Sequence, residues 1–376
     1  MRRRRATFTL TLAVLALVAG TAALVPSAVE GQAARHNVIL ITLDGARGEE
    51  IFGGLDVDVL RSTLEEKQRA EDSAIYKELW AAHPARRREK LMPFFWGTLM
   101  REHGSIAGNQ ALGSRVRLTN RHWFSYPGYS EMLVGRAHDD SIKSNDAMQN
   151  PYPTVLEFLR IRLRLPQEGV AAFASWSVFN AIAESKQGTV TINAGFEPYD
   201  HPDPQVKALS ALQFSTPTPW DTVRHDVYTA RLAMAHLTRQ KPQVLYLALG
   251  ETDDWAHDGR YDRVLEAYLR TDRIVRDLWE WLQSQPEYRG RTSLLITTDH
   301  GRGRGPAGWR HHGEKHPGSG DTWMAFISPH FKARGEWHNH TALETRQVAA
   351  TLVQWAGLDW KDFDPQVGPP VRPPTN

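Results

Sequence analysis

The chain has 376 residues, of which 41% are hydrophobic and 23% are charged, a balance typical of a globular protein and unlike that of a disordered one. The formal net charge is +2 and becomes −1 without residues 1–33, which hold four Arg and one Glu, so no nucleic acid polymer is expected as a partner. The chain has no cysteine, which excludes disulfides and thiolate metal sites and leaves His and carboxylates as ligands for any transition metal.

Residues 1–33 have the layout of a secretory signal peptide. Arginines at positions 2–5 form a positive region, residues 8–25 are an apolar run, and Gly31-Gln32-Ala33 fits a small-residue cleavage site. The pattern predicts a periplasmic or secreted protein with no stable membrane span after signal cleavage. The alternative is membrane anchoring by an uncleaved N-terminal segment, because the run approaches the ~18 apolar residues that a spanning helix needs.

Strands and helices alternate along the rest of the chain. In chain order, apolar runs rich in β-branched residues predict strands at residues 38–43, 170–175, 243–249, 292–298 and 323–328. Helical patterns occupy residues 152–164, 221–239, 261–285 and 343–355. This alternation predicts one α/β domain at residues 36–362, with a mainly parallel central sheet covered by helices on both faces. Residues 363–376 form a Pro-rich tail, expected to be a loose terminus.

Acidic residues and histidines stand where three of these strands end. Asp44 follows the first strand, and Asp299 and His300 follow the fourth. Asp253 and His257 follow the third strand, four residues apart, a spacing that brings both to one face of a helix. Ligands of parallel sheets bind at the carboxyl ends of strands, so these side chains are expected to lie on one rim. Each motif alone also fits a cap or a surface ion pair, but together they predict a metal site.

Histidines are also concentrated in the loop before the last predicted strand. His311, His312 and His316 lie within six residues of one another. A polar loop without a metal ion is the alternative explanation for this cluster.

The order of these motifs resembles that of the alkaline phosphatase superfamily, most closely its nucleotide pyrophosphatase/phosphodiesterase and sulfatase branches. The resemblance extends from about Asn37 to Phe331. It implies an alkaline phosphatase-like fold and two divalent metal ions, with Zn²⁺ expected and Mn²⁺ or Fe as alternatives. It assigns Asp253, His257 and His312 to one ion, and Asp44, Ser125, Asp299 and His300 to the other. His316 is the alternative to His312, and Asp254 competes with Asp253 but has the wrong spacing to His257.

Ser125 takes the position of the nucleophile that the resemblance implies. The segment from Phe124 to Gly135 resembles the phosphodiesterase pattern Thr-Phe-Pro-Asn-His-Tyr that ends in Gly. A helix N-terminus and a metal ion would both favour the alkoxide form of the serine. Ser125 acting only as a helix cap is the structural alternative, and Ser130 is the alternative nucleophile.

The chain departs from the family at Gly128 and Tyr129. These residues stand where the phosphodiesterase branch usually has Asn and His, so the substrate contacts made there are not carried over. Tyr129 also stands where the sulfatase motif C/S-x-P-x-R has its Arg, which argues against a formylglycine sulfatase. The candidates for binding the substrate are Lys143, Asn145, Arg310 and His316, and Arg121 and His122 are additional candidates.

The expected function is hydrolysis of a small-molecule phosphomonoester or phosphodiester through a phosphoseryl intermediate. A sulfatase-like sulfuric ester hydrolase and a phospho-group transferase acting on an envelope acceptor are the alternative enzymes. A non-catalytic binding protein is the third possibility, and the complete set of ligands together with Ser125 argues against it.

Overall fold

The computed structural model describes residues 35–374, and the predicted signal peptide at 1–33 lies outside them. From Arg35 onward the chain forms one compact unit. The strands are β1 (Asn37–Leu43), β2 (Gly104–Ala107), β3 (Val116–Arg117), β4 (Val170–Ala174), β5 (Thr191–Ala194), β6 (Val244–Leu249), β7 (Thr292–Thr297), β8 (Asp321–Thr322), β9 (Met324–Ile327), β10 (Gly335–Glu336) and β11 (Leu343–Glu344). The helices are α1 (Gly48–Gly53), α2 (Val57–Ser62), α3 (Ala74–Leu79), α4 (Pro84–Leu91), the π-helix η2 (Phe95–His103), α5 (Ser125–Val134), α6 (Val155–Arg162), α7 (Phe179–Ile182), α8 (Pro204–Leu212), α9 (Asp226–Gln240), α10 (Glu251–His257), α11 (Tyr261–Ser284), α12 (Gly305–Gly308) and α13 (Gln347–Trp355). Short 3-10 turns occur at Ala70–Asp72, Gln110–Leu112, Gln167–Gly169, Gln213–Ser215 and Trp360–Asp362.

The main sheet has eight strands in the order β10-β2-β9-β7-β1-β6-β4-β5. The strands from β7 to β5 run parallel to one another, while β9 is antiparallel to both of its neighbours, β7 and β2. A small second sheet joins β11, β3 and β8. The fold is therefore the α/β, mainly parallel arrangement that the sequence predicts.

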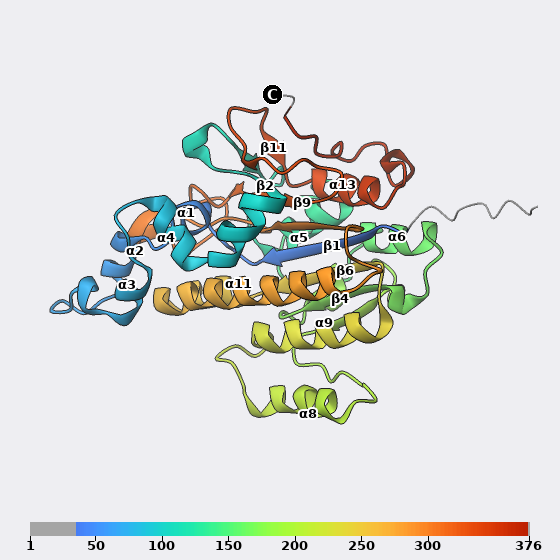
Figure 1. Cartoon of the computed structure of the whole chain (residues 1–376), viewed down its shortest axis with the longest axis horizontal. Coiled ribbons are helices and arrows are strands. Elements are labelled where there is room, and N and C mark those ends of the chain that lie inside the picture. Colours follow the sequence, from blue (N-terminus) through green and yellow to red (C-terminus); the bar gives the residue numbers. More distant parts are fainter. Residues whose placement is uncertain (1–34, 375–376) are drawn as a thin grey trace, which may run out of the picture. The chain divides into compact units, whose positions relative to one another are not determined.

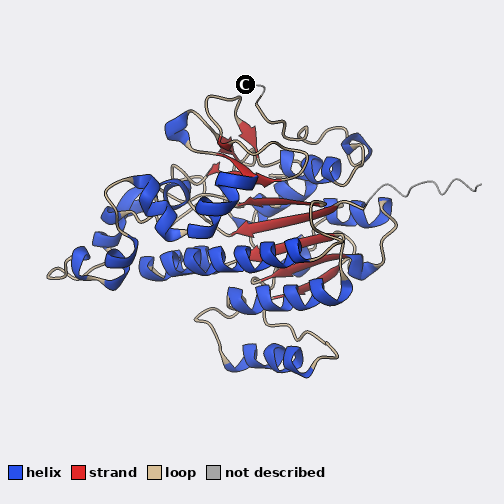
Figure 2. Cartoon of the chain, in the orientation of Figure 1, coloured by secondary structure: helices blue, strands red, loops and turns tan. Residues whose placement is uncertain are grey.

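Helices cover both faces of the main sheet (Figures 1 and 2). In β1, Ile39, Ile41 and Leu43 belong to one hydrophobic core, and Val38 and Leu40 belong to the other. The first core holds α9 and α11, which lie in front of the sheet in Figure 1, and the second holds α5, α6 and α13. A strand buried on both faces reads as a continuous apolar run, which explains the sequence of β1.

Three predicted helices begin later than their sequence patterns indicate, and α6 begins at Val155, directly after its N-cap Thr154, in place of residue 152. The helix expected at residues 221–239 starts at Asp226, because Val223 forms a β-bridge with Trp176. The helix expected at residues 343–355 starts at Gln347, because Leu343–Glu344 pairs with β3 as strand β11. In the last two segments, pairing with a distant strand prevails over local helical periodicity.

The Pro-rich tail differs from the loose terminus that was expected. Val367 and Val371 are buried, with 5% and 1% of their surface exposed. The backbone N–H of Val371 donates to Thr351 Oγ1 (2.9 Å), and that of Gly368 donates to the carbonyl of Gly135 (3.1 Å). The described part of the tail is thus packed against α13 and the end of α5.

No helix within residues 35–374 is both long enough and apolar enough to cross a bilayer.

Candidate metal and catalytic site

The predicted site residues converge where β1, β6 and β7 end. Asp44 follows β1 directly, and Asp299 lies two residues beyond β7. Asp253 lies on α10, which begins immediately after β6 and its following glycine. Since these three strands are neighbours in the parallel part of the sheet, their carboxyl ends bring the three carboxylates together.

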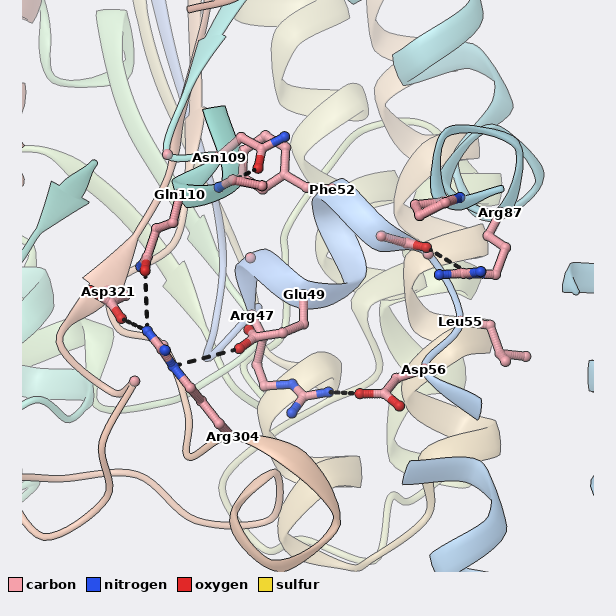
Figure 3. A pocket seen from close by; sticks show the side chains of 18 of the residues that line it. Arg47, Glu49, Phe52, Leu55, Asp56, Arg87, Asn109, Gln110, Arg304 and Asp321 are labelled. Atoms are coloured by element: carbon pink, nitrogen blue, oxygen red, sulfur yellow. Dashed lines mark hydrogen bonds and ion pairs between the residues drawn. The ribbon is translucent and has the colours of Figure 1, made fainter. Parts of the chain in front are cut away.

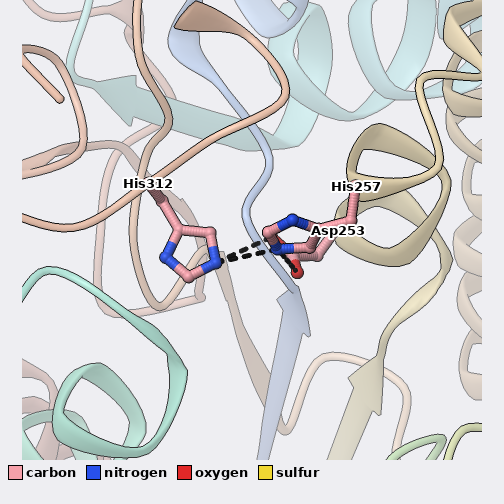
Figure 4. A group of neighbouring side chains, drawn as sticks. All are labelled: Asp253, His257 and His312. Atoms are coloured by element: carbon pink, nitrogen blue, oxygen red, sulfur yellow. Dashed lines mark hydrogen bonds and ion pairs between the residues drawn. The ribbon is translucent and has the colours of Figure 1, made fainter.

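Asp253, His257 and His312 form the first group of side chains that could hold a metal ion (Figure 4). His257 Nε2 lies 3.0 Å from Asp253 Oδ2 and 2.9 Å from His312 Nε2. Asp253 and His257 are one helical turn apart on α10, and His312 reaches them from the loop after α12. The ligand-type atoms of all three side chains lie within 4.8 Å of one another.

Asp44, Asp253 and His300 form a second such group, so Asp253 belongs to both. His300 Nε2 lies 3.4 Å from Asp44 Oδ1, 3.9 Å from Asp253 Oδ1 and 3.5 Å from Asp299 Oδ2. His300 Nδ1 contacts the carbonyl of Gly301 at 2.7 Å. A carbonyl only accepts hydrogen bonds, so the proton is on Nδ1 and Nε2 faces the carboxylates.

The carboxylates of this cluster perturb one another and His300. Burial raises the pKa of Asp299 well above its ordinary value, and the negative charge of Asp44 raises it further. Burial lowers the pKa of His300, but Asp299 and Asp44 more than offset this effect and bring the pKa to about 9. Burial, together with the nearby His300, lowers the pKa of His312. The cluster therefore favours the positively charged form of His300 and the neutral form of His312.

The donor set fits divalent cations. Asp44 Oδ1 and Asp299 Oδ2 are buried, and neither accepts a hydrogen bond from the residues that the structure describes. Buried carboxylate oxygens that lack hydrogen-bond donors are costly unless cations compensate them, and His300 is one cation facing the three carboxylates of Asp44, Asp253 and Asp299. Carboxylate oxygens combined with neutral imidazole nitrogens are the ligands that zinc takes in cysteine-free sites.

Ser125 is the first residue of α5 and lies beside the second group. Its side chain is 5% exposed, and its Oγ is 3.3 Å from His300 Nε2. The preceding residue, Phe124, provides no side-chain cap for the helix. The backbone N–H of Tyr126 instead donates to Asn145 Oδ1 at 2.9 Å.

Gly128 allows α5 to lie close to the end of β7. A Cβ atom at this position would be 2.4 Å from the carbonyl oxygen of Asp299. The asparagine that the phosphodiesterase branch usually has there would not fit this backbone approach. The departure at Gly128 thus has a packing reason.

The four candidate substrate-binding residues differ in the contacts that they make. Asn145 Oδ1 accepts the backbone N–H of Tyr126 in the first turn of α5, the helix that begins with Ser125. Arg310 donates to the carbonyl of His257 at 3.1 Å, next to the first group. His316 packs against His311 with ring centroids 5.3 Å apart, and Lys143 is exposed and its side chain forms no hydrogen bond or ion pair with the described residues.

The alternative site residues lie differently. Ser130 is five positions after Ser125 on α5, a separation that turns its side chain well away from that of Ser125, and its buried Oγ has no partner among the described residues. Asp254 belongs to neither group of potential ligands. Arg121 and His122 contact the acidic pair Asp139 and Asp140.

Two residues at the site lie outside the predicted ligands and substrate contacts. Tyr129, one turn after Ser125 on α5, donates its hydroxyl to Asp44 Oδ2 at 3.0 Å. Arg302 is buried, contacts Asp253 Oδ1, and donates to the carbonyls of Trp309 and Arg310. The i, i+4 spacing places Tyr129 near Ser125 on α5 but does not indicate its contact with Asp44, and nothing in the sequence distinguishes Arg302 from other arginines.

A cavity of about 570 Å³ lies apart from this cluster (Figure 3). It is bordered by charged residues that pair among themselves: Arg304 donates to Asp321 and Gln110, and Arg47 lies 4.0 Å from Asp56. None of the predicted metal ligands lines it. The side-chain cluster, and not this cavity, therefore defines the candidate site.

Residues 62–356 match the model of the type I phosphodiesterase / nucleotide pyrophosphatase family. The match includes Ser125 and the predicted ligands from Asp253 to His312, and it begins after Asp44. A comparison with curated proteins found no match.

Several solved structures have the same fold. The alkaline phosphatase PafA is 10% identical with a TM-score of 0.54, over 90% of this chain and 98% of that one. The lipoteichoic acid synthase LtaP from Listeria monocytogenes is 10% identical with a TM-score of 0.51, over 87% and 73%. Ps i-CgsB is 14% identical with a TM-score of 0.51, over 86% and 72%. At such low identities the likeness establishes the fold alone.

Proposed function

The chain belongs to the type I phosphodiesterase / nucleotide pyrophosphatase family, within the alkaline phosphatase superfamily of hydrolases. From this premise we propose that it hydrolyses small phosphate esters with Ser125 as the nucleophile. We propose that two divalent cations, zinc in the first instance, are held by Asp253, His257 and His312 and by Asp44, Asp299, His300 and Ser125. Manganese or iron are the other ions that this ligand set suits.

The observation that carries the proposal is the position of Ser125. Its Oγ lies 3.3 Å from His300 Nε2, which is itself 3.4 Å from Asp44 Oδ1. A serine hydroxyl that only capped a helix would not need the imidazole of His300 and the carboxylate of Asp44 close to it. The N-terminus of α5 adds partial positive charge where an alkoxide would form.

In the proposed reaction, Ser125 Oγ gives up its proton and forms a bond to phosphorus. The bond from phosphorus to the leaving oxygen breaks, and that oxygen keeps the electron pair and takes up the proton that Ser125 released. The oxygen of a water molecule then bonds to phosphorus, the bond from phosphorus to Ser125 Oγ breaks, and one proton of the water goes to Ser125 Oγ as phosphate or a phosphomonoester leaves. Bound divalent cations would supply neutralisation of the developing negative charge and lower the pKa of the attacking groups.

Asn145 is the best-supported substrate contact. Its Oδ1 is occupied by the N–H of Tyr126, which orients the side chain beside Ser125. Its Nδ2 donates to none of the described residues and is free to bind a non-bridging phosphate oxygen. Arg310, His316 and Lys143 are further candidates that would act on more distant parts of the substrate.

Phosphate is preferred over sulfate in this proposal because of Tyr129. Formylglycine sulfatases need an Arg at this position, whereas the Tyr129 hydroxyl is already used by Asp44. We further propose that residues 1–33 direct export to the periplasm or the exterior. Anchoring by an uncleaved segment is the alternative.

The test is turnover by the purified mature protein, supplied with zinc, of p-nitrophenyl phosphate, bis-p-nitrophenyl phosphate and p-nitrophenyl sulfate. We expect turnover of a phosphate ester that Ser125→Ala abolishes and that Ser130→Ala, the matched control on the same helix, retains. Dominant sulfate turnover would overturn the substrate class. Full activity in Ser125→Ala would overturn the nucleophile, and no turnover of any ester would favour an envelope phospho-group transferase or a binding protein.

A further inference from the structure

Glu131 is a fully buried carboxylate on α5, six residues after the proposed nucleophile. No cationic side chain pairs with it within residues 35–374. It accepts hydrogen bonds from the backbone N–H groups of Thr119 (2.9 Å), Asn120 (2.7 Å) and Arg346 (3.1 Å), and from Asn120 Nδ2 (2.8 Å). A buried charge that is held only by N–H donors fixes the backbone that supplies those donors.

Asn120 transmits this constraint toward Ser125. Because its Nδ2 donates to Glu131, its Oδ1 must face the other way. That oxygen accepts the backbone N–H groups of His122 (3.1 Å) and Trp123 (3.0 Å). Asn120 is 2% exposed, so water does not compete for these bonds.

Trp123 has a backbone conformation that costs free energy. Its φ is +53°, in the left-handed region that non-glycine residues rarely adopt. Its indole packs on Gly320, where a Cβ atom would lie 2.8 Å from the ring. After this residue, Phe124 is extended and Ser125 begins α5. The left-handed residue thus sets the direction from which the chain enters the nucleophile's helix.

The same turn is tied to the loop that carries Asn145. The N–H of Arg121 donates to Asp139 Oδ1 at 3.1 Å, and His122 Nε2 donates to the carbonyl of Asp139 at 2.9 Å. Residues 119–124 therefore connect Glu131, Ser125 and the loop after Asp139. A shift of this turn would move the nucleophile and the candidate phosphate-binding amide together.

We propose that Glu131 is a positioning residue that, through Asn120, holds the 119–124 turn and thereby sets the place of Ser125 Oγ relative to His300 and Asp44. The catalytic half of this inference rests on the proposed function. The structural half, that Glu131 holds the turn, does not.

The experiment compares Glu131→Gln with Glu157→Gln in the full mature chain. Glu157, on α6, is the matched control. It is 5% exposed and accepts hydrogen bonds from the backbone N–H groups of Thr154, Ser185 and Lys186. In either variant an amide NH₂ group replaces one carboxylate oxygen and faces the N–H donors that the oxygen accepted. Because two donors then oppose each other, both variants should have a lower melting temperature than the wild type. In Glu131→Gln alone, kcat should fall about 10- to 100-fold with KM little changed, as expected for a misplaced nucleophile.

Hydrogen exchange read by mass spectrometry supplies a readout that needs no activity. Glu131→Gln should speed exchange in the peptide covering residues 118–126, and Glu157→Gln should speed it only around residues 154 and 185. Asn120→Ala, which keeps the backbone N–H bonds to Glu131, should reproduce the loss of kcat if Glu131→Gln does not fold.

The inference is overturned if Glu131→Gln and Asn120→Ala keep kcat within about twofold of the wild type, or if Glu157→Gln loses as much. It is also overturned if exchange at residues 118–126 is unchanged. If the wild-type protein turns over no ester while exchange in that peptide does increase, the proposed function fails and the structural role of Glu131 stands.

Discussion

The hydroxyl of Tyr129 donates a hydrogen bond to the side chain of Asp44. It reaches Asp44 Oδ2 at 3.0 Å and leaves Oδ1 free to face His300. Burial raises the pKa of Tyr129 well above its ordinary value, so the phenol keeps its proton and remains a donor. A donor behind a candidate ligand orients the carboxylate and tunes its basicity.

We predict that Tyr129→Phe weakens zinc binding by about 10- to 100-fold, because Asp44 loses the group that orients it. Zinc affinity would be measured by competition with a chelator. The matched control is Tyr246→Phe, which removes an equally buried hydroxyl whose partner is Thr42 Oγ1 (3.0 Å). Equal zinc affinity in the wild type and Tyr129→Phe would contradict the prediction.

At the scale of residues, sequence indicates the cluster and not its supporting contacts. Asp44, Asp253 and Asp299 could be predicted because each follows a strand with an unmistakable apolar pattern. The contacts of Tyr129 and Arg302 could not, since they depend on how α5 and the loop after β7 fold back onto the ends of the strands. Spacing along the chain carries no record of these tertiary approaches.

At the scale of elements, α5 is defined by how closely it approaches β7. Gly128 faces the backbone of Asp299 with room for no side chain, although it stands in the middle of a helix, where glycine is unfavourable. Gly128 therefore lowers the intrinsic stability of α5, but it allows the helix to lie close enough to the end of β7 for Ser125 to contact His300.

We predict that Gly128→Ala lowers the melting temperature and reduces kcat, because the new methyl group would lie 2.4 Å from the Asp299 carbonyl oxygen unless α5 moves away. Overpacking of this kind costs about 1–3 kcal/mol. Gly97→Ala in η2, where a Cβ atom meets nothing within 4 Å, is the control and should keep or raise stability. A Gly128→Ala protein with wild-type melting temperature and kcat would refute the close approach.

Elements with a distinct apolar pattern could be predicted from sequence, and strands of two residues could not. Helix α11 and strands β1, β6 and β7 lie within a residue of their predicted bounds, because each carries a sustained hydrophobic period. The two-residue strands β3, β8, β10 and β11 are too short to show any period. They exist because distant segments pair with them, which local sequence does not record.

At the scale of the whole molecule, the candidate site is a concentration of buried negative charge. Asp44, Asp253 and Asp299 are 6%, 7% and 0% exposed, and His300 and Arg302 are the nearby cationic groups. The alternation of strands and helices in the sequence predicts the α/β class and the edge of the sheet at which these carboxylates lie. It does not predict that β9 lies antiparallel between β2 and β7, because strand order depends on crossover connections that hydrophobic periodicity does not reveal.

We predict that removing divalent cations with a chelator lowers the free energy of unfolding, since cations at 1,000 times their Kd stabilise the folded state by about 4 kcal/mol. The measurement is thermal unfolding by calorimetry with zinc and with chelator. Asp299→Asn, which weakens the proposed site, should show a smaller difference between the two conditions. Identical melting temperatures in both conditions for the wild type would contradict the prediction.

Strand β1 is the first of the described strands to be synthesised, and both of its neighbours come late in the chain. It pairs with β6 and β7, so Val38 waits for Val244 on one side and Ser293 on the other. A nascent chain therefore carries residues 38–43 as an apolar strand with both edges open until more than 200 further residues have been made. We expect this segment to be the part of the growing polypeptide that most needs a chaperone.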